Sequence, residues 1–213
     1  DIISSTPKVF SATALNAYHM AYGDGTYTSF VSSDAYRKRS STISSMGFIG
    51  ANDGMLHAIR VGYLKEKDFS AADLAADVKA LFQNFFSGDT GADKLGEEAW
   101  AYIPFNAFPY LKYLADPTYC HIYYNDLTVN LLDVSIGAPT GCTETNTSLC
   151  TKTADSWKTV LIGSMRFGAA CSGGISPTGP PTGAPANVGF SSFYALDITD
   201  PENPVPMWEF TDP

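Results

Sequence analysis

Few side chains in this chain could carry catalytic chemistry. It has three histidines, His19, His57 and His121. His57 and His121 stand in apolar segments that look like strands, where an imidazole is more often a hydrogen-bonded core residue than a base. The sequence contains no G-x-S-x-G elbow, no H-E-x-x-H pair and no phosphate-binding loop. We therefore expect neither a catalytic nor a cofactor-binding residue.

The acidic side chains are not spaced for a metal ion. A calcium loop brings oxygen ligands together at alternate positions, as in D-x-D-x-D. In this chain Asp197, Asp200 and Glu202 are separated by turn residues, and Asp126 and Asp133 are seven positions apart around a strand. Neither set has the required density of ligands, so we expect no metal site in this chain.

The cysteines favour structural disulfides. They number four, Cys120, Cys142, Cys150 and Cys171, and none forms a C-x-x-C or C-x-x-C-H motif. Three pairings are possible. Cys142 and Cys150 bracket a short polar loop that a bridge could close, and we expect this pair, with Cys120 and Cys171 as the second. Free thiols in a reducing compartment are the alternative.

Charge and hydropathy narrow the class of partner. The chain has 22 acidic and 13 basic residues and a net charge of −9, which argues against nucleic acid or an anionic membrane as its partner. The basic cluster at 37–39 lies in a serine-rich segment and indicates a solvated turn. No apolar run approaches the roughly 20 residues that span a bilayer, and no signal peptide is present. A leader would have been removed or would lie upstream.

The elements that position these residues are mainly β-strands. Residues 46–59 are typical of a hairpin, because strand-forming Phe48 and Ile49 precede turn residues at 52–54 and an apolar run then resumes. Segments 159–164 and 192–198 repeat this order. Strands containing Trp100 and Trp208 follow the two units. Such repetition is typical of radial all-β architectures, and an ordinary β-sandwich is the alternative.

The length suggests an incomplete ring. A propeller blade takes about 40 to 50 residues, and propellers usually close with four to eight blades. The 213 residues supply about three blades once two insertions are set aside. We therefore expect one segment of a propeller domain over 1–213, and a chain that is a fragment of a longer protein.

The two insertions differ in character. The first has a helical pattern over about 69–88, with Ser70 as its N-cap. It is expected to pack on the propeller rim, with a partner-binding helix as the alternative. The second, about 171–188, is rich in glycine and proline and predicts a long surface loop, either a flexible excursion or a contact site. A short helix is also expected over 107–114.

One motif resembles a known family. Residues 50–58 are GANDGMLHA, which is similar to a hallmark segment of the PilY/PilC family of type IV pilus proteins. Four more segments follow in that family's order, namely EEAWAYIP at 97–104, HIYY at 121–124, WKTVLIG at 157–163 and FYALDIT at 193–199. The resemblance is weakest over 65–96 and 138–188.

The resemblance implies a partial, quinoprotein-like β-propeller in an exported, non-catalytic protein of pilus biogenesis and pilus-tip adhesion. Minor pilins or pilin-like tip subunits, an unknown surface ligand and the remaining blades, from the same or a companion chain, would be its partners. It would reach the cell surface or pilus through the periplasm. Calcium would belong to the full-length parent. The alternatives are a pyrroloquinoline-quinone oxidoreductase and a surface scaffold unrelated to pili.

Overall fold

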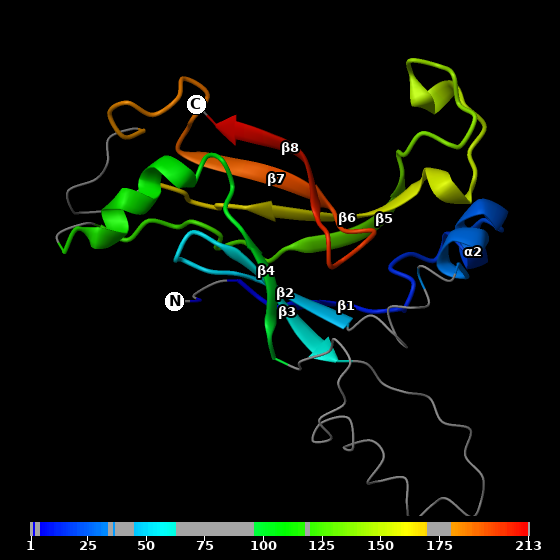
Figure 1. Ribbon diagram of the computed structural model, residues 1–213, viewed down its shortest axis with the longest axis horizontal. Helices are drawn as coiled ribbons and strands as arrows, with labels where there is room; N and C mark the ends of the chain where they lie inside the picture. Colours follow the sequence, from blue (N-terminus) through cyan, green and yellow to red (C-terminus); the bar gives the residue numbers. More distant parts are fainter. Residues whose placement is uncertain are drawn as a thin grey trace, which may run out of the picture.

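The computed structural model describes residues 2, 5–33, 36, 45–62, 96–117, 120–169 and 180–212. These residues form two four-stranded antiparallel sheets with the strand orders β1-β2-β3-β4 and β5-β6-β7-β8. The first sheet consists of β1 (Lys8–Phe10), β2 (Ser45–Gly50), β3 (Leu56–Gly62) and β4 (Glu98–Tyr102). The second consists of β5 (Asn130–Ser135), β6 (Trp157–Ser164), β7 (Ser191–Asp197) and β8 (Val205–Asp212). Figure 1 shows the two sheets as stacked layers.

Short helices connect the strands. They are α1 (Tyr18–Ala21), α2 (Gly25–Val31) and the 3₁₀ helices η2 (Phe108–Ala115), η3 (Thr147–Leu149) and η4 (Ala154–Ser156). The helix expected over 107–114 is therefore present, in 3₁₀ form. The connection between β5 and β6 lies beside α2 (Figure 1), where the Lys152 Nζ is 2.6 Å from the Asp24 Oδ2.

The mostly β architecture confirms the expected all-β class, but the described residues form two sheets where about three blades were expected. The difference arises because β1 and β5 each complete a sheet of four strands. The helix expected over 69–88 and the basic cluster at 37–39 lie outside the described residues. So does most of the glycine- and proline-rich loop, whose described part, 180–188, consists of turns and bends.

The two sheets repeat the same register. In each, a row of side chains crosses three strands and ends on a tryptophan: Phe48, Ala58 and Trp100 in the first, and Ile162, Ala195 and Trp208 in the second. The pairing with the tryptophan strand shifts at the same place, directly after Ala58 and directly after Ala195. A matching register and a matching irregularity make the two sheets copies of one structural unit.

We call the side of each sheet that carries this row its tryptophan face, and the other side its reverse face. Successive residues of a strand point to opposite faces. Leu161 and Leu196 each neighbour a residue of the row in the second sheet, so they lie on its reverse face. Both pack in one core cluster with Phe48 of the first sheet. The tryptophan face of the first sheet therefore packs on the reverse face of the second.

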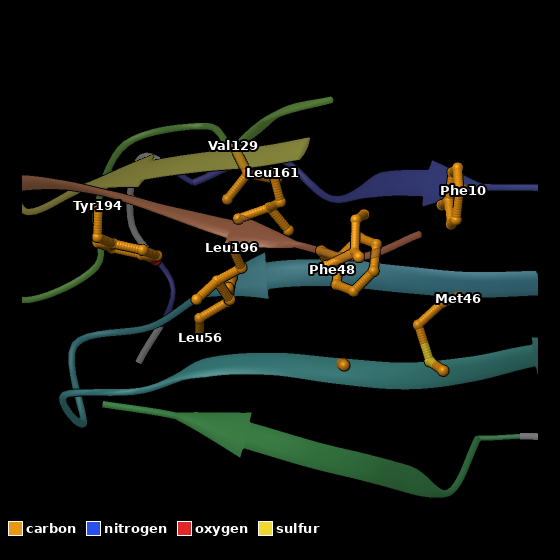
Figure 2. Close-up of a cluster of buried hydrophobic side chains, with 10 residues drawn as sticks. Phe10, Met46, Phe48, Leu56, Val129, Leu161, Tyr194 and Leu196 are labelled. Carbon is orange, nitrogen blue, oxygen red and sulfur yellow. The ribbon is translucent and has the colours of Figure 1, made fainter. Parts of the chain in front are cut away.

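This core is tightly closed. Phe48, Leu56, Leu161 and Leu196 are each 0% exposed, and Tyr194 is 1% exposed. Figure 2 shows these side chains pointing toward one another from the two layers. Full burial of one such side chain stabilises a fold by about 1.5–3 kcal/mol, so this contact is the main source of cohesion between the sheets.

A buried carboxylate ties the N-terminal segment to the second sheet. Asp133 on β5 is 0% exposed. Its Oδ2 accepts hydrogen bonds from the hydroxyls of Tyr27, at 2.8 Å, and Tyr36, at 3.0 Å, while its Oδ1 accepts one from the Thr159 hydroxyl at 2.7 Å. The Leu15 amide donates to the Oδ2 as well. Burial of a carboxylate is costly unless it is hydrogen-bonded, and four donors meet that requirement.

Replacing this carboxylate tests its role. Asp133→Ala removes the acceptor of the Tyr27 and Thr159 hydroxyls and leaves the Tyr36 hydroxyl only the Thr13 carbonyl, and we expect a loss of about 3 kcal/mol in the free energy of unfolding. Urea denaturation followed by tryptophan fluorescence measures it. Glu144→Ala, at an exposed position of the β5–β6 connection, is the control and should change stability little. Equal stability of the two variants would contradict the assigned role.

Candidate functional site

The family-like motif at 50–58 builds the β2–β3 hairpin. The Ala51 amide donates to the Met55 carbonyl at 3.0 Å, and the Met55 amide donates to the Asp53 Oδ1 at 2.9 Å. Gly54 has a φ of +100°, which side chains other than glycine rarely adopt. A Cβ at Gly54 would also overlap Leu111 of η2. The turn therefore depends on glycine for its backbone and for its packing.

The motif also holds the segment that leads to the second sheet. The Asn125 side-chain amide donates to the Gly54 carbonyl at 2.9 Å, and the Tyr124 amide donates to the Asn52 Oδ1 at 3.2 Å. A Cβ at Gly50 would overlap the Asn125 carbonyl. The Tyr194 hydroxyl of β7 donates to the Asn125 Oδ1 at 2.9 Å, which completes a link between the two sheets. The motif residues therefore make structural contacts that hold the hairpin and the adjoining segment together.

His57 is not a core residue, so the expectation of a core imidazole at this position was wrong. Its neighbours Leu56 and Ala58 point into the core, so His57 points to the reverse face of the first sheet. Its Nε2 lies 2.9 Å from the Asp53 Oδ2 and its Nδ1 lies 2.9 Å from the Glu98 Oε1. Strand alternation within the motif could have revealed this orientation.

The two contacts require a protonated imidazole. A neutral ring has one N–H donor, and its other nitrogen would present a lone pair to a carboxylate. Both hydrogen bonds form only with the imidazolium. Partial burial lowers the pKa of His57, but the hydrogen bonds and charges of Glu98 and Asp53 outweigh burial and raise the pKa above its ordinary value. The imidazolium joins the hairpin turn to β4.

A second set of contacts joins the sheets at the β7–β8 turn. The Trp100 Nε1 donates to the Pro201 carbonyl at 2.7 Å. The Arg60 guanidinium pairs with both oxygens of Glu202, at 3.2 and 2.6 Å, and also contacts Glu97 at 3.3 Å. The indole and the guanidinium therefore fix the turn of the second sheet on the tryptophan face of the first.

The other residues considered from the sequence have local contacts. The Asp197 and Asp200 carboxylates accept amide hydrogen bonds within their own turn. The described residues contain no group of three or more His, Cys, Asp or Glu side chains that could hold a metal ion. His121 lies outside any strand, with its ring edge-on to Tyr123 at 4.7 Å. His19 packs against Tyr27, with ring centroids 5.5 Å apart.

Three of the four cysteines are disulfide-bonded in the described residues. Cys142 is bonded to Cys150. Cys120 is also disulfide-bonded, and Cys171 lies outside the described residues, so the pairing of these two stays a prediction.

Sequence analysis missed the contribution of the N-terminal segment. Helix α2 is capped by Asp24, whose Oδ1 accepts from the amides of Thr26 and Tyr27. Asp followed by a short run with aromatic residues was the available signal. No local sequence pattern indicates that Tyr27 and Tyr36 contact Asp133. Each tyrosine lies about a hundred positions from Asp133 in the chain.

The sequence has curated relatives over nearly its whole length. A type IV pilus biogenesis factor PilY1 homolog of Xylella fastidiosa is 26% identical over 193 residues, which cover 88% of this chain and 9% of the relative. The type IV pilus biogenesis factor PilY1 of Pseudomonas aeruginosa is 26% identical over 218 residues, covering 98% of this chain and 12% of the relative. The chain is PilY1-like. This confirms the resemblance seen in the motif at 50–58.

The PilY1-like chain spans only about a tenth of the length of these relatives. No family model matches the sequence. The crystal structure of the Pseudomonas aeruginosa PilY1 C-terminal domain aligns over 95% of this chain and 25% of that domain, with 21% identity and a TM-score of 0.42. Within the part of the chain that the structure describes, no helix is long and apolar enough to cross a membrane.

We expect His57 to titrate above its ordinary pKa of about 6.5. The imidazolium's contribution to stability is complete below this value and is lost as the pH rises through the raised pKa of the folded state. NMR titration of the imidazole gives the pKa. Glu98→Gln removes one carboxylate and should lower it. A wild-type ring that titrates at or below 6.5 would contradict the paired imidazolium.

Trp100 and Trp208, which end the repeated row in the two sheets, should differ in their contribution to the free energy of unfolding. Trp100→Phe removes the donor to the Pro201 carbonyl and should cost about 1–3 kcal/mol of stability. Trp208→Phe is the matched control, because Trp208 is 47% exposed in the equivalent position. Urea denaturation of both variants, followed by circular dichroism, tests this difference. A larger loss for Trp208→Phe would contradict it.

Proposed function

We propose that this chain is part of a type IV pilus-associated protein that acts by binding and not by catalysis. The observation that carries the proposal is its similarity to PilY1 over 98% of its length, including the motif at 50–58. The whole of each relative is described as a pilus biogenesis factor, and this chain matches only a small part of it. The assignment of this role to residues 1–213 is therefore our extension.

The contacts of the candidate functional side chains support the binding role. The motif asparagine and its glycines hold the adjoining segments, and the two carboxylates near His57 are occupied by its imidazolium. Minor pilins or pilin-like tip subunits, and a ligand on a surface, are the partners we propose. Export through the periplasm to the pilus or cell surface suits the disulfide between Cys142 and Cys150.

We further propose that the two sheets are consecutive blades of a β-propeller. Four-stranded antiparallel sheets that stack in the same orientation are its building units. The matching register of the two sheets and the packing of a tryptophan face on a reverse face support this arrangement. A closed ring needs further sheets of the same kind.

Deletion of the coding region for residues 5–212 in the bacterium that carries it tests the pilus role. We expect loss of surface pili and of surface attachment, seen by electron microscopy and an adhesion assay, and recovery on complementation. Unchanged piliation and attachment would contradict the proposal. Reduction of a redox dye by the purified protein after addition of pyrroloquinoline quinone would favour the oxidoreductase alternative instead.

A further inference from the structure

The connection between β5 and β6 forms a loop that projects away from both sheets. It runs over residues 136–156, and Figure 1 shows its outer part, which contains η3, in yellow-green at the upper right. The Thr140 amide donates to the Asp155 Oδ2 at 2.7 Å, which closes the base of the loop. The disulfide between Cys142 and Cys150 closes it a second time, nearer the tip. The tip is thus held in place while residues 143–146 are exposed.

The sequence at this tip is an acceptor for glycosylation. Asn146, Thr147 and Ser148 form an N-x-[ST] sequon with no proline at its middle position. No other asparagine of the 213 residues is followed two positions later by serine or threonine. Attachment of a glycan needs an asparagine that a transferase can reach, in a surface loop. Asn146 is exposed and lies in such a loop.

The local hydrogen bonds prepare the Asn146 amide for reaction. Its Oδ1 accepts hydrogen bonds from the Ser148 amide at 3.1 Å and from the Ser148 hydroxyl at 2.7 Å. A hydrogen bond to the charged form of a group favours that form, and two donors stabilise negative charge on this oxygen. The Nδ2 of the same amide therefore loses a proton more readily. This serine hydroxyl is the group that distinguishes a sequon from any other asparagine.

We infer that Asn146 is a site of N-linked glycosylation. The donor is an oligosaccharide activated as a lipid-linked diphosphate, and a transferase brings it to the loop. The Asn146 Nδ2 attacks the anomeric carbon of the first sugar and forms a carbon–nitrogen bond. The bond between this carbon and the diphosphate oxygen breaks, the lipid diphosphate leaves, and the proton of the Nδ2 passes to a base of the transferase.

This inference rests on the proposed export, because the chain would meet the donor and the transferase in the periplasm. The same compartment allows the disulfide between Cys142 and Cys150 to form. The disulfide and the glycan would thus be added to one loop during export.

A carboxylate beside the acceptor gives the transferase a second point of recognition. Glu144 lies two positions before Asn146 and is exposed. The loop between Cys142 and Cys150 contains no basic residue, so the Glu144 charge is not neutralised within it. A transferase that holds the loop through a basic side chain would attract this charge. We expect the recognised segment to extend from Glu144 to Ser148.

A purely structural role for Asn146 makes a different prediction. Asn146 is also the N-cap of η3, through the hydrogen bond from the Ser148 amide. Aspartate caps a helix about as well as asparagine, because its side-chain oxygen accepts the same bond. Asn146→Asp therefore keeps the cap but removes the Nδ2 that would carry the glycan. One substitution separates the two roles.

Mass spectrometry of the intact protein, isolated from the cells that produce it, tests the inference. The protein is reduced and digested, and the peptide that contains Asn146 is fragmented. We expect a mass increment of sugars on Asn146. Asn203 is the matched control, because it is exposed but is followed by Pro204 and forms no sequon. An unmodified Asn146, or equal modification of Asn203, would overturn the inference.

Variants of the loop test the assigned roles. Asn146→Asp and Ser148→Ala should each abolish the modification, whereas Ser148→Thr, which keeps a hydroxyl, should retain it. Asn146→Asp should leave the midpoint of urea denaturation unchanged. Glu144→Gln should lower the modified fraction. Modification that survives Ser148→Ala, or that Glu144→Gln leaves at the wild-type level, would contradict the recognition of the loop as described.

The location of the protein separates the possible failures. An unmodified Asn146 in protein recovered from the cell surface, with the bond between Cys142 and Cys150 intact, would overturn the glycosylation site and retain the proposed export. Protein found solely in the cytoplasm, with reduced cysteines, would reject both.

Discussion

Burial of one face of the first sheet against the opposite face of the second is the constraint on which the rest of this structure depends. A β-sheet must cover its apolar face, and these sheets share one contact in which Phe48 and Leu56 meet Leu161 and Leu196. Because strand register decides which residues lie on which face, a slip of one position would remove the contact. The polar interactions of the junction hold that register.

The polar contacts gather at the two ends of this apolar contact. At one end Asn125 connects the hairpin turn to Tyr194, and at the other Trp100 and Arg60 hold the β7–β8 turn. Each joins segments far apart in the chain and contributes on the order of 1 kcal/mol, less than the burial of one large apolar side chain. Burial supplies most of the stabilisation, and the hydrogen bonds select one arrangement.

The strands could be predicted from the sequence because their information is local. Sequence patterns at 46–59, 159–164 and 192–198 and around Trp100 and Trp208 indicated six of the eight strands of the described residues. The expected count of about three blades is not confirmed, because the described residues form two sheets of four strands and only strand pairing shows how β1 and β5 complete them. Asp133 had no local signal, since its donors lie on the distant N-terminal segment.

The candidate site was harder to predict for a related reason. An imidazole between apolar neighbours suggested a core position for His57, yet strand alternation places it on the other face, where its two carboxylates come from the turn and from β4. The motif at 50–58 indicated a family but no chemical function. Its residues hold the hairpin and the segment at 124–125 in place.

The two copies of the structural unit differ in the side chains that they carry at key positions. At equivalent positions the first sheet has His57 and Arg60 and the second has Tyr194 and Asp197. Tyr194 lets the reverse face of the second sheet be buried, whereas the ion cluster of His57 keeps that of the first sheet polar at its centre. Arg60 pairs with Glu202 of the β7–β8 turn, whereas Asp197 pairs with Lys158 of the neighbouring strand. Two sheets with the same strand register therefore carry different charges at equivalent positions.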